Sequence, residues 1–391
     1  MRIGIFTDHF YPELGGIQDS VAELARELGR RGHKVDIWAP RPSKENFIFV
    51  GLPFREIDLG ENVHIRRVFS FGFPSSSLQS RVATPFFSIG TATYDVIHVH
   101  SFICIGFRGM RVAKRSRTPL IGTDHWAIAE FADCIHWFFE QVFRRATVWW
   151  VTWFYNRFDF ITAPSTFVLT KKEAGGFIKP YTAVSNPIDT DTFTPAAQGE
   201  REYARKKFGL DGKVVACVGR IAPEKKNDVV LRAFAELLRK VPDAMLAFGG
   251  HGSFEGEMKV LARELGVRDR VRFLGTLTKQ EVAELYHASD VYAIASVSET
   301  QSMSLIQAFA AGLSAVGVRW GAIPEYLNAE RGSLFERDDH YQMAKQLEAL
   351  LTDEKKRKRF GANAAAFARK FSVQAVVSEW EKIYTKVVDT R

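Results

Sequence analysis

Apolar positions change period along the first forty residues, from a continuous run to a helical spacing and back. The run Ile3-Gly-Ile-Phe6 is typical of a short buried strand, and a turn-rich loop follows it over 8–16. The next segment repeats apolar residues at the spacing of one helix face: Ile17, Val21, Leu24, Ala25 and Leu28. Another apolar run occupies 35–38. Strand, helix and strand in this order predict parallel pairing in an α/β sheet.

Further strand-like apolar runs follow along the chain: 96–100, 119–122, 214–218, 244–248 and 291–295. A helix is expected over 229–240, and the capping-box pattern Thr278-Lys-Gln-Glu281 predicts another helix start. The stretch 186–198 is rich in Pro, Thr and Asp, which is typical of a linker. At 391 residues the chain exceeds the size at which single cores stop growing. We therefore predict two doubly wound, Rossmann-like α/β domains, 1–195 and 196–372, that face each other across a cleft.

Composition narrows the class of protein. The three cysteines (Cys104, Cys134 and Cys217) lie far apart, which argues against a disulfide framework or a zinc site and fits a reducing compartment. The N-terminal run resembles a strand rather than a signal peptide, and no apolar run reaches the roughly 18 residues of a membrane-spanning helix. We expect a cytoplasmic protein.

The net charge is +8 and the pI about 9.3, which favours an anionic partner. Nucleic acid, an anionic membrane surface and a phosphorylated substrate all satisfy that description. The basic residues do not accompany a recognised nucleic-acid-binding module, so no nucleic-acid partner is predicted.

Two segments suit a phosphate group. Gly15 and Gly16 stand between a strand and a helix, where free N–H groups and the helix dipole attract anions. Arg220 follows a strand in the second unit, and Lys225 comes five residues later; together they could grip a diphosphate. The alternatives are a glycine turn required only by sterics, and a solvated basic loop.

Two further segments suit a sugar. Glu299 lies in a loop after a strand, where its carboxylate could accept hydroxyl hydrogen bonds, and N–H groups at the following helix start, Met303 to Leu305, point the same way. His125 follows the strand at 119–122 and could bond a hydroxyl. The alternatives are an ordinary acidic residue at a helix start and a structural histidine.

An aromatic and basic stretch suits a membrane surface. Five of the eight tryptophans fall within 126–153: Trp126, Trp137, Trp149, Trp150 and Trp153. Arg144 and Arg145 lie among them, and upstream Arg108, Arg111 and Arg115 share one helix face. Tryptophan prefers the lipid–water interface, and arginine suits anionic headgroups. The alternative is a Trp-rich core beside a solvated helix face.

With these residues in place, the sequence resembles glycosyltransferase family 4, whose members are retaining enzymes of the GT-B fold. The resemblance rests on motifs that occur in the family's order over nearly the whole chain: Tyr11–Gly16, Thr123–His125, Ala163–Ser165, Ser185–Asp189 with Phe193, Gly219–Lys225, Phe273–Gly275, Ser289–Asp290, and Glu299 through Ala308 and Gly312. It also implies that a C-terminal helix over 373–391 crosses back to the first domain.

The resemblance implies a role for each matching residue. Gly16 would contact the diphosphate and His125 the transferred sugar, while Arg220 and Lys225 would neutralise the leaving phosphates. Glu299 would hold sugar hydroxyls, helped by the main chain at Met303, Ser304 and Leu305. Gly250 and Leu277 would lie near the nucleotide base. Gln307 stands where the family has a second glutamate for the ribose, so that contact lacks charge assistance.

Asp189-Thr-Asp191 formally matches the Asp-x-Asp signature of metal-dependent glycosyltransferases. It falls in the predicted linker, so it is interpreted as a turn, and neither a metal nor another cofactor is expected.

Segments such as Ser298–Gln301 and Asn156–Ser165 are similar to those of bacterial diacylglycerol glucosyltransferases, which are peripheral membrane proteins. The resemblance therefore implies transfer of a hexose, glucose from UDP-glucose, to a glycerolipid such as diacylglycerol at the inner face of the cell membrane. Two alternatives stay open: a family 4 enzyme acting on a soluble or polysaccharide acceptor, and a nucleotide-sugar binding protein that has lost catalysis.

Overall fold

The computed structural model describes residues 1–13, 15–72, 81–84, 86–89, 92–125, 137–173 and 176–390, without the side chains at 49–50, 137–144 and 171–173. The chain forms two compact units. The first comprises Met1–Pro187 together with Val373–Arg391, and the second comprises Ile188–Ser372. The division falls eight residues before the boundary placed at 195 from the sequence, because Ile188 already bridges to Ser372 of the second unit.

The first unit contains a parallel sheet of seven strands in the order β3-β2-β1-β6-β7-β8-β9. Its strands are β1 (Arg2–Phe6), β2 (Lys34–Pro40), β3 (Val63–Val68), β6 (Val96–Val99), β7 (Leu120–Thr123), β8 (Phe160–Ala163) and β9 (Tyr181–Ala183). A separate antiparallel ribbon pairs β4 (Ser70–Gly72) with β5 (Arg81–Ala83).

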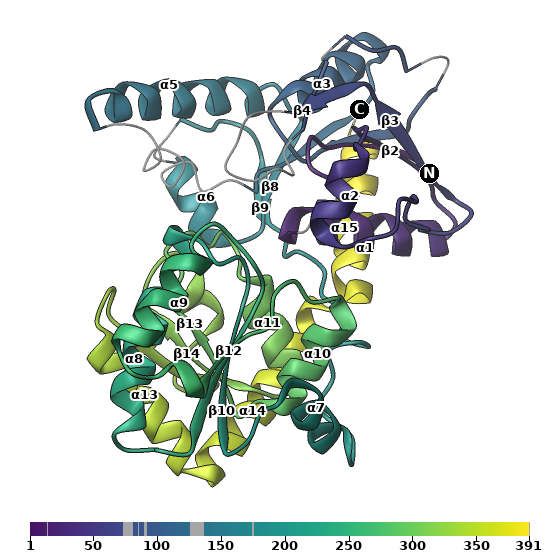
Figure 1. The fold of residues 1–391 in the computed structure, drawn as a ribbon. Coiled ribbons are helices and arrows are strands. Elements are labelled where there is room, and N and C mark those ends of the chain that lie inside the picture. Colours follow the sequence, from purple (N-terminus) through teal and green to yellow (C-terminus); the bar gives the residue numbers. More distant parts are fainter. Residues whose placement is uncertain are drawn as a thin grey trace. The chain divides into compact units, whose positions relative to one another are not determined.

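Helices cover both faces of this sheet (Figure 1). The helices described in this unit are α1 (Gly16–Arg30), α2 (Lys44–Val50), α3 (Cys104–Ser116), α5 (Trp137–Tyr155), α6 (Thr166–Glu173) and α15 (Val373–Asp389). Successive strand residues enter opposite cores: Ile3 and Ile5 pack with residues of α1 and α15, whereas Phe6 packs with residues of α3 and α5. The C-terminal helix α15 therefore completes the first unit, where Glu381 accepts a 2.6 Å hydrogen bond from Arg31.

The second unit has a parallel sheet of six strands in the order β12-β11-β10-β13-β14-β15. The strands are β10 (Lys213–Val218), β11 (Ala244–Gly249), β12 (Val271–Phe273), β13 (Val291–Ile294), β14 (Ser314–Val318) and β15 (Gly332–Phe335). The helices are α7 (Glu200–Phe208), α8 (Asn227–Leu238), α9 (Glu255–Glu264), α10 (Lys279–Ala288), α11 (Met303–Ala310), α12 (Ile323–Tyr326), α13 (His340–Thr352) and α14 (Glu354–Ala368). Both units are thus Rossmann-like, which confirms the predicted fold class.

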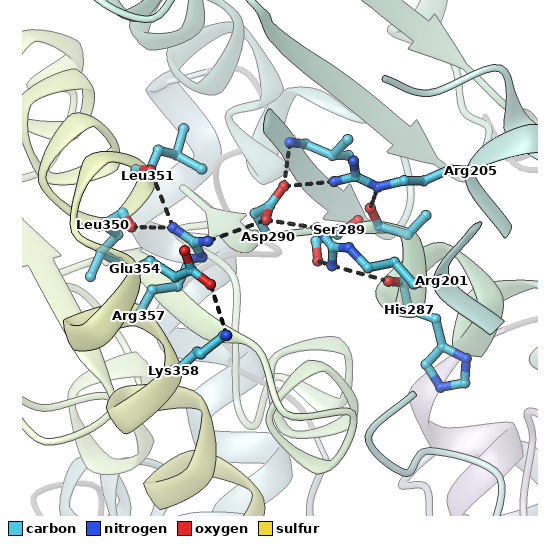
Figure 2. A network of polar contacts seen from close by, with 12 residues as sticks. Arg201, Arg205, His287, Ser289, Asp290, Leu350, Leu351, Glu354, Arg357 and Lys358 are labelled. Atoms are coloured by element: carbon cyan, nitrogen blue, oxygen red, sulfur yellow. Dashed lines mark hydrogen bonds and ion pairs between the residues drawn. The ribbon is translucent and has the colours of Figure 1, made fainter. Parts of the chain in front are cut away.

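A buried carboxylate ties several elements of the second unit together (Figure 2). Asp290 accepts hydrogen bonds from the Val214 N–H at 2.8 Å, Arg201 Nη2 at 2.7 Å and Arg205 Nη2 at 3.0 Å. Arg357 of α14 lies 3.6 Å from the same carboxylate. Both α7 arginines also donate to carbonyls at the end of α10. Asp290 therefore joins α7, α10 and α14 to the start of β10.

Candidate functional site

The second unit gathers the predicted donor residues at the carboxyl ends of its central strands. Gly219 follows β10 with φ 145°, and Gly250 follows β11 with φ 136°, both in the region that favours glycine. A Cβ on Gly250 would lie 2.0 Å from the Gly219 carbonyl oxygen, so the two loops approach at backbone contact. Leu277 packs its methyl group beside the neighbouring Gly249. This edge is where open α/β sheets bind ligands.

Lys225 and Glu299, 74 residues apart in sequence, form an ion pair at this edge. Lys225 Nζ donates to Glu299 Oε1 at 2.7 Å, and the two side chains are only 22% and 12% exposed. Lys225 ends a short 3-10 helix, η2 (Pro223–Lys225), and Glu299 lies in the loop after β13. The structure therefore brings together the residue expected to neutralise a phosphate and the residue expected to hold a sugar.

Arg220 lies on the same loop, but it pairs elsewhere. Its Nη2 donates to Glu224 Oε1 at 2.6 Å, and its side chain is more than half exposed. The Glu224 carbonyl in turn accepts a hydrogen bond from the Val297 N–H at 3.1 Å, which joins this loop to the one that carries Glu299. Glu224 was missed from the sequence, although its position four residues after Arg220 is an ordinary ion-pair spacing.

The sequence predicts free N–H groups at the start of α11, but one of them is already bonded. Ser302 is the N-cap, and its hydroxyl accepts from the Leu305 N–H at 3.3 Å, so this N–H is not free as predicted. Ser304 Oγ accepts from the buried Tyr292 hydroxyl at 2.8 Å. The half-buried side chain of Gln307 has no hydrogen-bond partner among the described residues. Only part of the predicted main-chain donor set is therefore open to a ligand.

Cys217 lies near the ion pair of Lys225 and Glu299, but its thiol is not a nucleophile. Burial raises the pKa of its thiol to about 12, and Asn227 Nδ2 lies 3.8 Å from the sulfur. A thiol with so high a pKa stays protonated at neutral pH, and only the thiolate is a good nucleophile.

In the first unit, Gly16 begins α1 and Gly15 precedes it, as the sequence suggested. The neighbouring Leu14 lies outside the described residues. A different helix start is already filled: Asp8 accepts from the N–H groups of Ile105 and Gly106, at 2.8 and 3.2 Å, at the start of α3. Among the described residues, no side chain caps the N-terminus of α1, whereas that of α3 is capped by Asp8. The start of α1 therefore suits a phosphate, as predicted.

His125 lies just beyond β7 and is buried. Its Nε2 is 3.0 Å from Nδ1 of His100, a residue at the end of β6 that was not singled out from the sequence. Burial, and to a smaller extent the nearby His9, lowers the pKa of His125 to about 3, so its ring is neutral at physiological pH. The pattern His98-Val-His100, with polar residues at strand spacing in an apolar run, was the available signal.

A shallow hollow that is partly open to solvent lies beside the loops after β1 and β2. Its lining combines apolar and polar side chains: Phe10, Tyr11, Pro12, Glu13, Pro40, Pro42, Asn46 and Arg81.

The predicted membrane residues gather on α3 and α5. Arg111 lies over the Phe107 ring, Phe107 stacks on Trp150 at 6.3 Å, and Trp150 stacks on Trp153 at 5.0 Å. Trp150 and Trp153 pack against the core, whereas Trp149 is 65% exposed. The tryptophans thus divide between core and surface.

The cations of this region stand without acidic partners. Among the side chains that the structure describes, no carboxylate forms an ion pair with any of the following: Arg108, Arg111, Lys114, Arg115 and Arg145. Burial and the neighbouring Arg115 and Arg111 lower the pKa of Arg108. Trp126 lies outside the described residues, as do the side chains of Trp137 and Arg144.

Asp189 behaves as a turn residue. It accepts hydrogen bonds from Thr192 and from Lys279 Nζ. Burial alone would raise its pKa, but these bonds lower it to about 2. Within the described ranges, no group of three or more His, Cys, Asp or Glu side chains is arranged to hold a metal ion. Nor does this part of the chain contain a helix of the length and apolarity needed to span a bilayer.

Comparison with known proteins agrees with this architecture. The model of "Glycosyltransferase Family 4" matches 14–192, and that of "Glycosyl transferases group 1" matches 200–367. A D-inositol 3-phosphate glycosyltransferase of Corynebacterium aurimucosum is 30% identical over 417 residues, covering 98% of this chain and 96% of the relative. The chain belongs to glycosyltransferase family 4.

A second relative is named for a lipid product rather than for an inositol phosphate. An alpha-monoglucosyldiacylglycerol synthase of Streptococcus pneumoniae is 28% identical over 322 residues, covering 80% of this chain and 70% of the relative. The crystal structure of Anabaena Alr3699/HepE in complex with UDP-glucose has a TM-score of 0.77 at 17% identity, and the match covers 99% of this chain and 100% of that one. The fold is thus the GT-B fold, and this family 4 protein is a glycosyltransferase.

Proposed function

We propose that this enzyme transfers a hexose, glucose from UDP-glucose, to a membrane glycerolipid such as diacylglycerol, with retention of anomeric configuration. The observation that carries the proposal is the ion pair between Lys225 and Glu299 at the carboxyl edge of the second sheet. It sets a cation for phosphate beside a carboxylate for sugar hydroxyls, which is the arrangement that a nucleotide-sugar requires.

Lys225 and Arg220 supply the charge stabilisation. As the bond between the sugar and the diphosphate breaks, negative charge grows on the leaving phosphate, and two cations at the end of β10 can stabilise it. This role would need no metal ion. Glu299 would meanwhile accept hydrogen bonds from the sugar, and the acceptor hydroxyl would attack the same face, guided by the departing phosphate. No side chain is assigned as a nucleophile, and no organic cofactor is assigned.

Support for UDP-glucose comes from fold relatives, of which one is solved in complex with that molecule. A donor screen by thermal shift tests it. UDP-glucose should raise the melting temperature of the second unit, because a ligand that binds only the folded state stabilises it. GDP- and ADP-sugars are the matched controls. Stabilisation by one of these sugars, and not by UDP-glucose, would reject the donor assignment.

Support for a lipid acceptor comes from the first unit. The α3 cations lack acidic partners among the described side chains, and Arg111 lies over the Phe107 ring, which stacks on Trp150 of α5. The next residue of α5 toward the N-terminus, Trp149, is exposed. A basic surface beside an exposed aromatic ring suits peripheral attachment to an anionic membrane. The synthase from Streptococcus pneumoniae is, by its name, a lipid glucosyltransferase. Incorporation of labelled glucose into diacylglycerol vesicles tests the acceptor, and the anomeric configuration of the product tests retention.

A soluble acceptor is the second candidate. The Corynebacterium relative, which aligns with more of the chain, is named for an inositol phosphate acceptor. Vesicle sedimentation separates the two: an enzyme that stays in the supernatant with anionic vesicles, and glucosylates a soluble polyol phosphate, would favour this candidate.

Substitution of the two cations tests the chemistry. We expect Lys225→Met to lower turnover by about 10²- to 10³-fold, because it removes a charge that stabilises the transition state. Arg220→Met should act in the same direction. Arg239→Met is the matched control, since Arg239 is an exposed cation that pairs with Glu236 on the same unit. Near-normal turnover of the Lys225 variant would contradict the assigned role.

A further inference from the structure

A row of buried imidazoles lies at the carboxyl edge of the first sheet. His98 and His100 extend from β6 with ring centroids 4.0 Å apart, and the rings of His100 and His125 lie nearly parallel, with centroids 5.3 Å apart and an interplanar angle of 17°. His98 is fully buried, while His100 and His125 are 2% and 7% exposed. Three polar rings at this depth require that their nitrogens be accounted for individually.

His98 has a partner on each nitrogen. Nδ1 lies 2.8 Å from the Tyr384 hydroxyl of α15, and Nε2 lies 2.6 Å from Thr123 Oγ1. Hydroxyl groups can donate or accept, so either tautomer of His98 is satisfied. The two hydrogen bonds therefore fix the His98 ring in place, and the His100 ring packs against it.

His100 is different, because only one of its nitrogens has a partner. Nδ1 lies 3.0 Å from His125 Nε2, whereas Nε2 is buried with no hydrogen-bond partner among the described residues. Burial lowers the pKa of both rings, so each is neutral and carries a single N–H. In the bond that joins them, one ring must donate and the other must accept.

The unpartnered nitrogen decides the direction of this bond. If His125 donated from Nε2, the proton of His100 would reside on Nε2, as a buried N–H with nothing to accept it. If His100 donates from Nδ1, only a lone pair is left unpaired. Buried N–H groups without acceptors are the rarer and costlier defect. His100 therefore donates, His125 Nε2 accepts, and the His125 proton is left on Nδ1.

We propose that His100 is a positioning residue: it fixes the tautomer of His125, so that His125 Nδ1 presents an N–H donor to a hydroxyl of the transferred sugar. The sugar contact rests on the function proposed above, whereas the tautomer rests on the geometry of the first unit alone. The ring nitrogen that carries the proton is set by the hydrogen bond that the other nitrogen makes. A donor fixed in advance need not reorganise when the sugar binds.

The tautomer can be measured directly on the full-length protein. Histidine-selective ¹⁵N labelling gives a pair of ring signals, Nδ1 and Nε2, for each of the ten histidines, and the loss of one pair in His125→Ala assigns His125. In the unsubstituted protein we expect the His125 pattern of a protonated Nδ1 and an unprotonated Nε2. In His100→Phe, which keeps an aromatic ring but cannot donate, the proton should shift toward Nε2. A protonated Nε2 in the unsubstituted protein, or an unchanged pattern in His100→Phe, overturns the proposal.

A matched variant separates positioning from packing. In His100→Asn the amide nitrogen can occupy the place of Nδ1 and donate to His125, so it should retain the tautomer and most of the activity. His100→Phe should lower kcat about tenfold through the lost hydrogen bond. Combined with His125→Ala, it should cause no further loss. Additive losses in the double variant would overturn the coupling.

The two proposals fail in different ways. If His125→Ala transfers glucose normally, the sugar contact is wrong, and the tautomer spectrum still tests His100. If His100→Phe proves unstable, the spectrum of the unsubstituted protein and the His100→Asn variant still decide the matter.

Discussion

Two residues of the second unit adopt a left-handed backbone and pair with each other. Lys226 has φ 52° and Asp338 has φ 63°, and Lys226 Nζ lies 3.1 Å from Asp338 Oδ1. Lys226 directly follows Lys225, whose side chain pairs with Glu299. Such strain at a non-glycine residue is retained where the surroundings over-determine it, which is common beside functional sites.

Substitutions at Asp338 test this strain. Asp338→Ala and Asp338→Gly both remove the ion pair, but only glycine adopts a left-handed conformation without steric cost. We therefore expect the glycine variant to be more stable than the alanine variant by about 1 kcal/mol, as measured by urea unfolding. Equal stability of the two variants would show that the turn is not strained. Glu336→Gln, which breaks the exposed pair with Arg319, is the control for loss of a surface ion pair.

At the scale of elements, the contacts of Asp290 with Arg201, Arg205 and Arg357 hold three helices against the second sheet. Replacing Asp290 by alanine would leave Arg201, Arg205 and Arg357 facing one another without their shared carboxylate. Loss of one partner from a buried pair costs about 3–5 kcal/mol, so the melting temperature of the second unit should fall by several degrees. Arg201→Ala should cost less, because its side chain is partly exposed and the other arginines remain. If Asp290→Ala lowers the melting temperature no more than Arg201→Ala does, Asp290 does not hold these helices together.

The sequence predicts most interior strands of the two parallel sheets, but it misses the interior strands β8 and β14 and all four edge strands. The predicted strands are mostly apolar because parallel strands are buried on both faces, although β2 contains Asp36 and β6 contains His98. In contrast, β3 carries Arg66 and Arg67 and lies at a sheet edge, so it lacks an apolar run. The capping box at Thr278 is confirmed, since its hydroxyl accepts from the Glu281 N–H.

For the site residues, the sequence predicts positions along the chain but not the contacts between them. The glycine and lysine positions could be placed from the sequence, because each lies next to a predictable strand end. The pairings could not. Lys225 meets Glu299 across 74 residues, and His100 meets His125 across 25, through the order of strands in each sheet. A sequence pattern is local, whereas strand order is set by packing of the whole unit.

At the scale of the whole molecule, the three imidazoles make the first unit sensitive to acid. Burial lowers the pKa of His98 and His100 well below 6.5 and that of His125 to about 3. Below pH 6.5 the unfolded chain therefore binds up to three protons that the folded unit does not, so stability falls as the pH falls. The slope should approach about 4 kcal/mol per pH unit between 6 and 4. His9, whose pKa is raised, binds its proton in both states and adds nothing there.

Urea unfolding followed between pH 7 and 4 measures this slope. His100→Asn removes one titrating ring and should lower the slope by about a third. Stability that is flat across this range would mean that the rings are not held neutral in the folded protein.

In the proposed function, the enzyme attaches to an anionic membrane through the outer face of α3. Arg111 and Arg115 are exposed there, and each cation near an anionic surface contributes about 1 kcal/mol of binding. Arg111→Gln with Arg115→Gln should therefore weaken binding to phosphatidylglycerol vesicles about 30-fold at low salt. The matched control is Lys206→Gln with Arg239→Gln, which removes the same charge from the second unit. If both pairs weaken sedimentation equally, net charge rather than this face drives attachment. Trp149→Ala should also weaken it, in a manner insensitive to salt, since a tryptophan ring contributes by entering the interface rather than by charge.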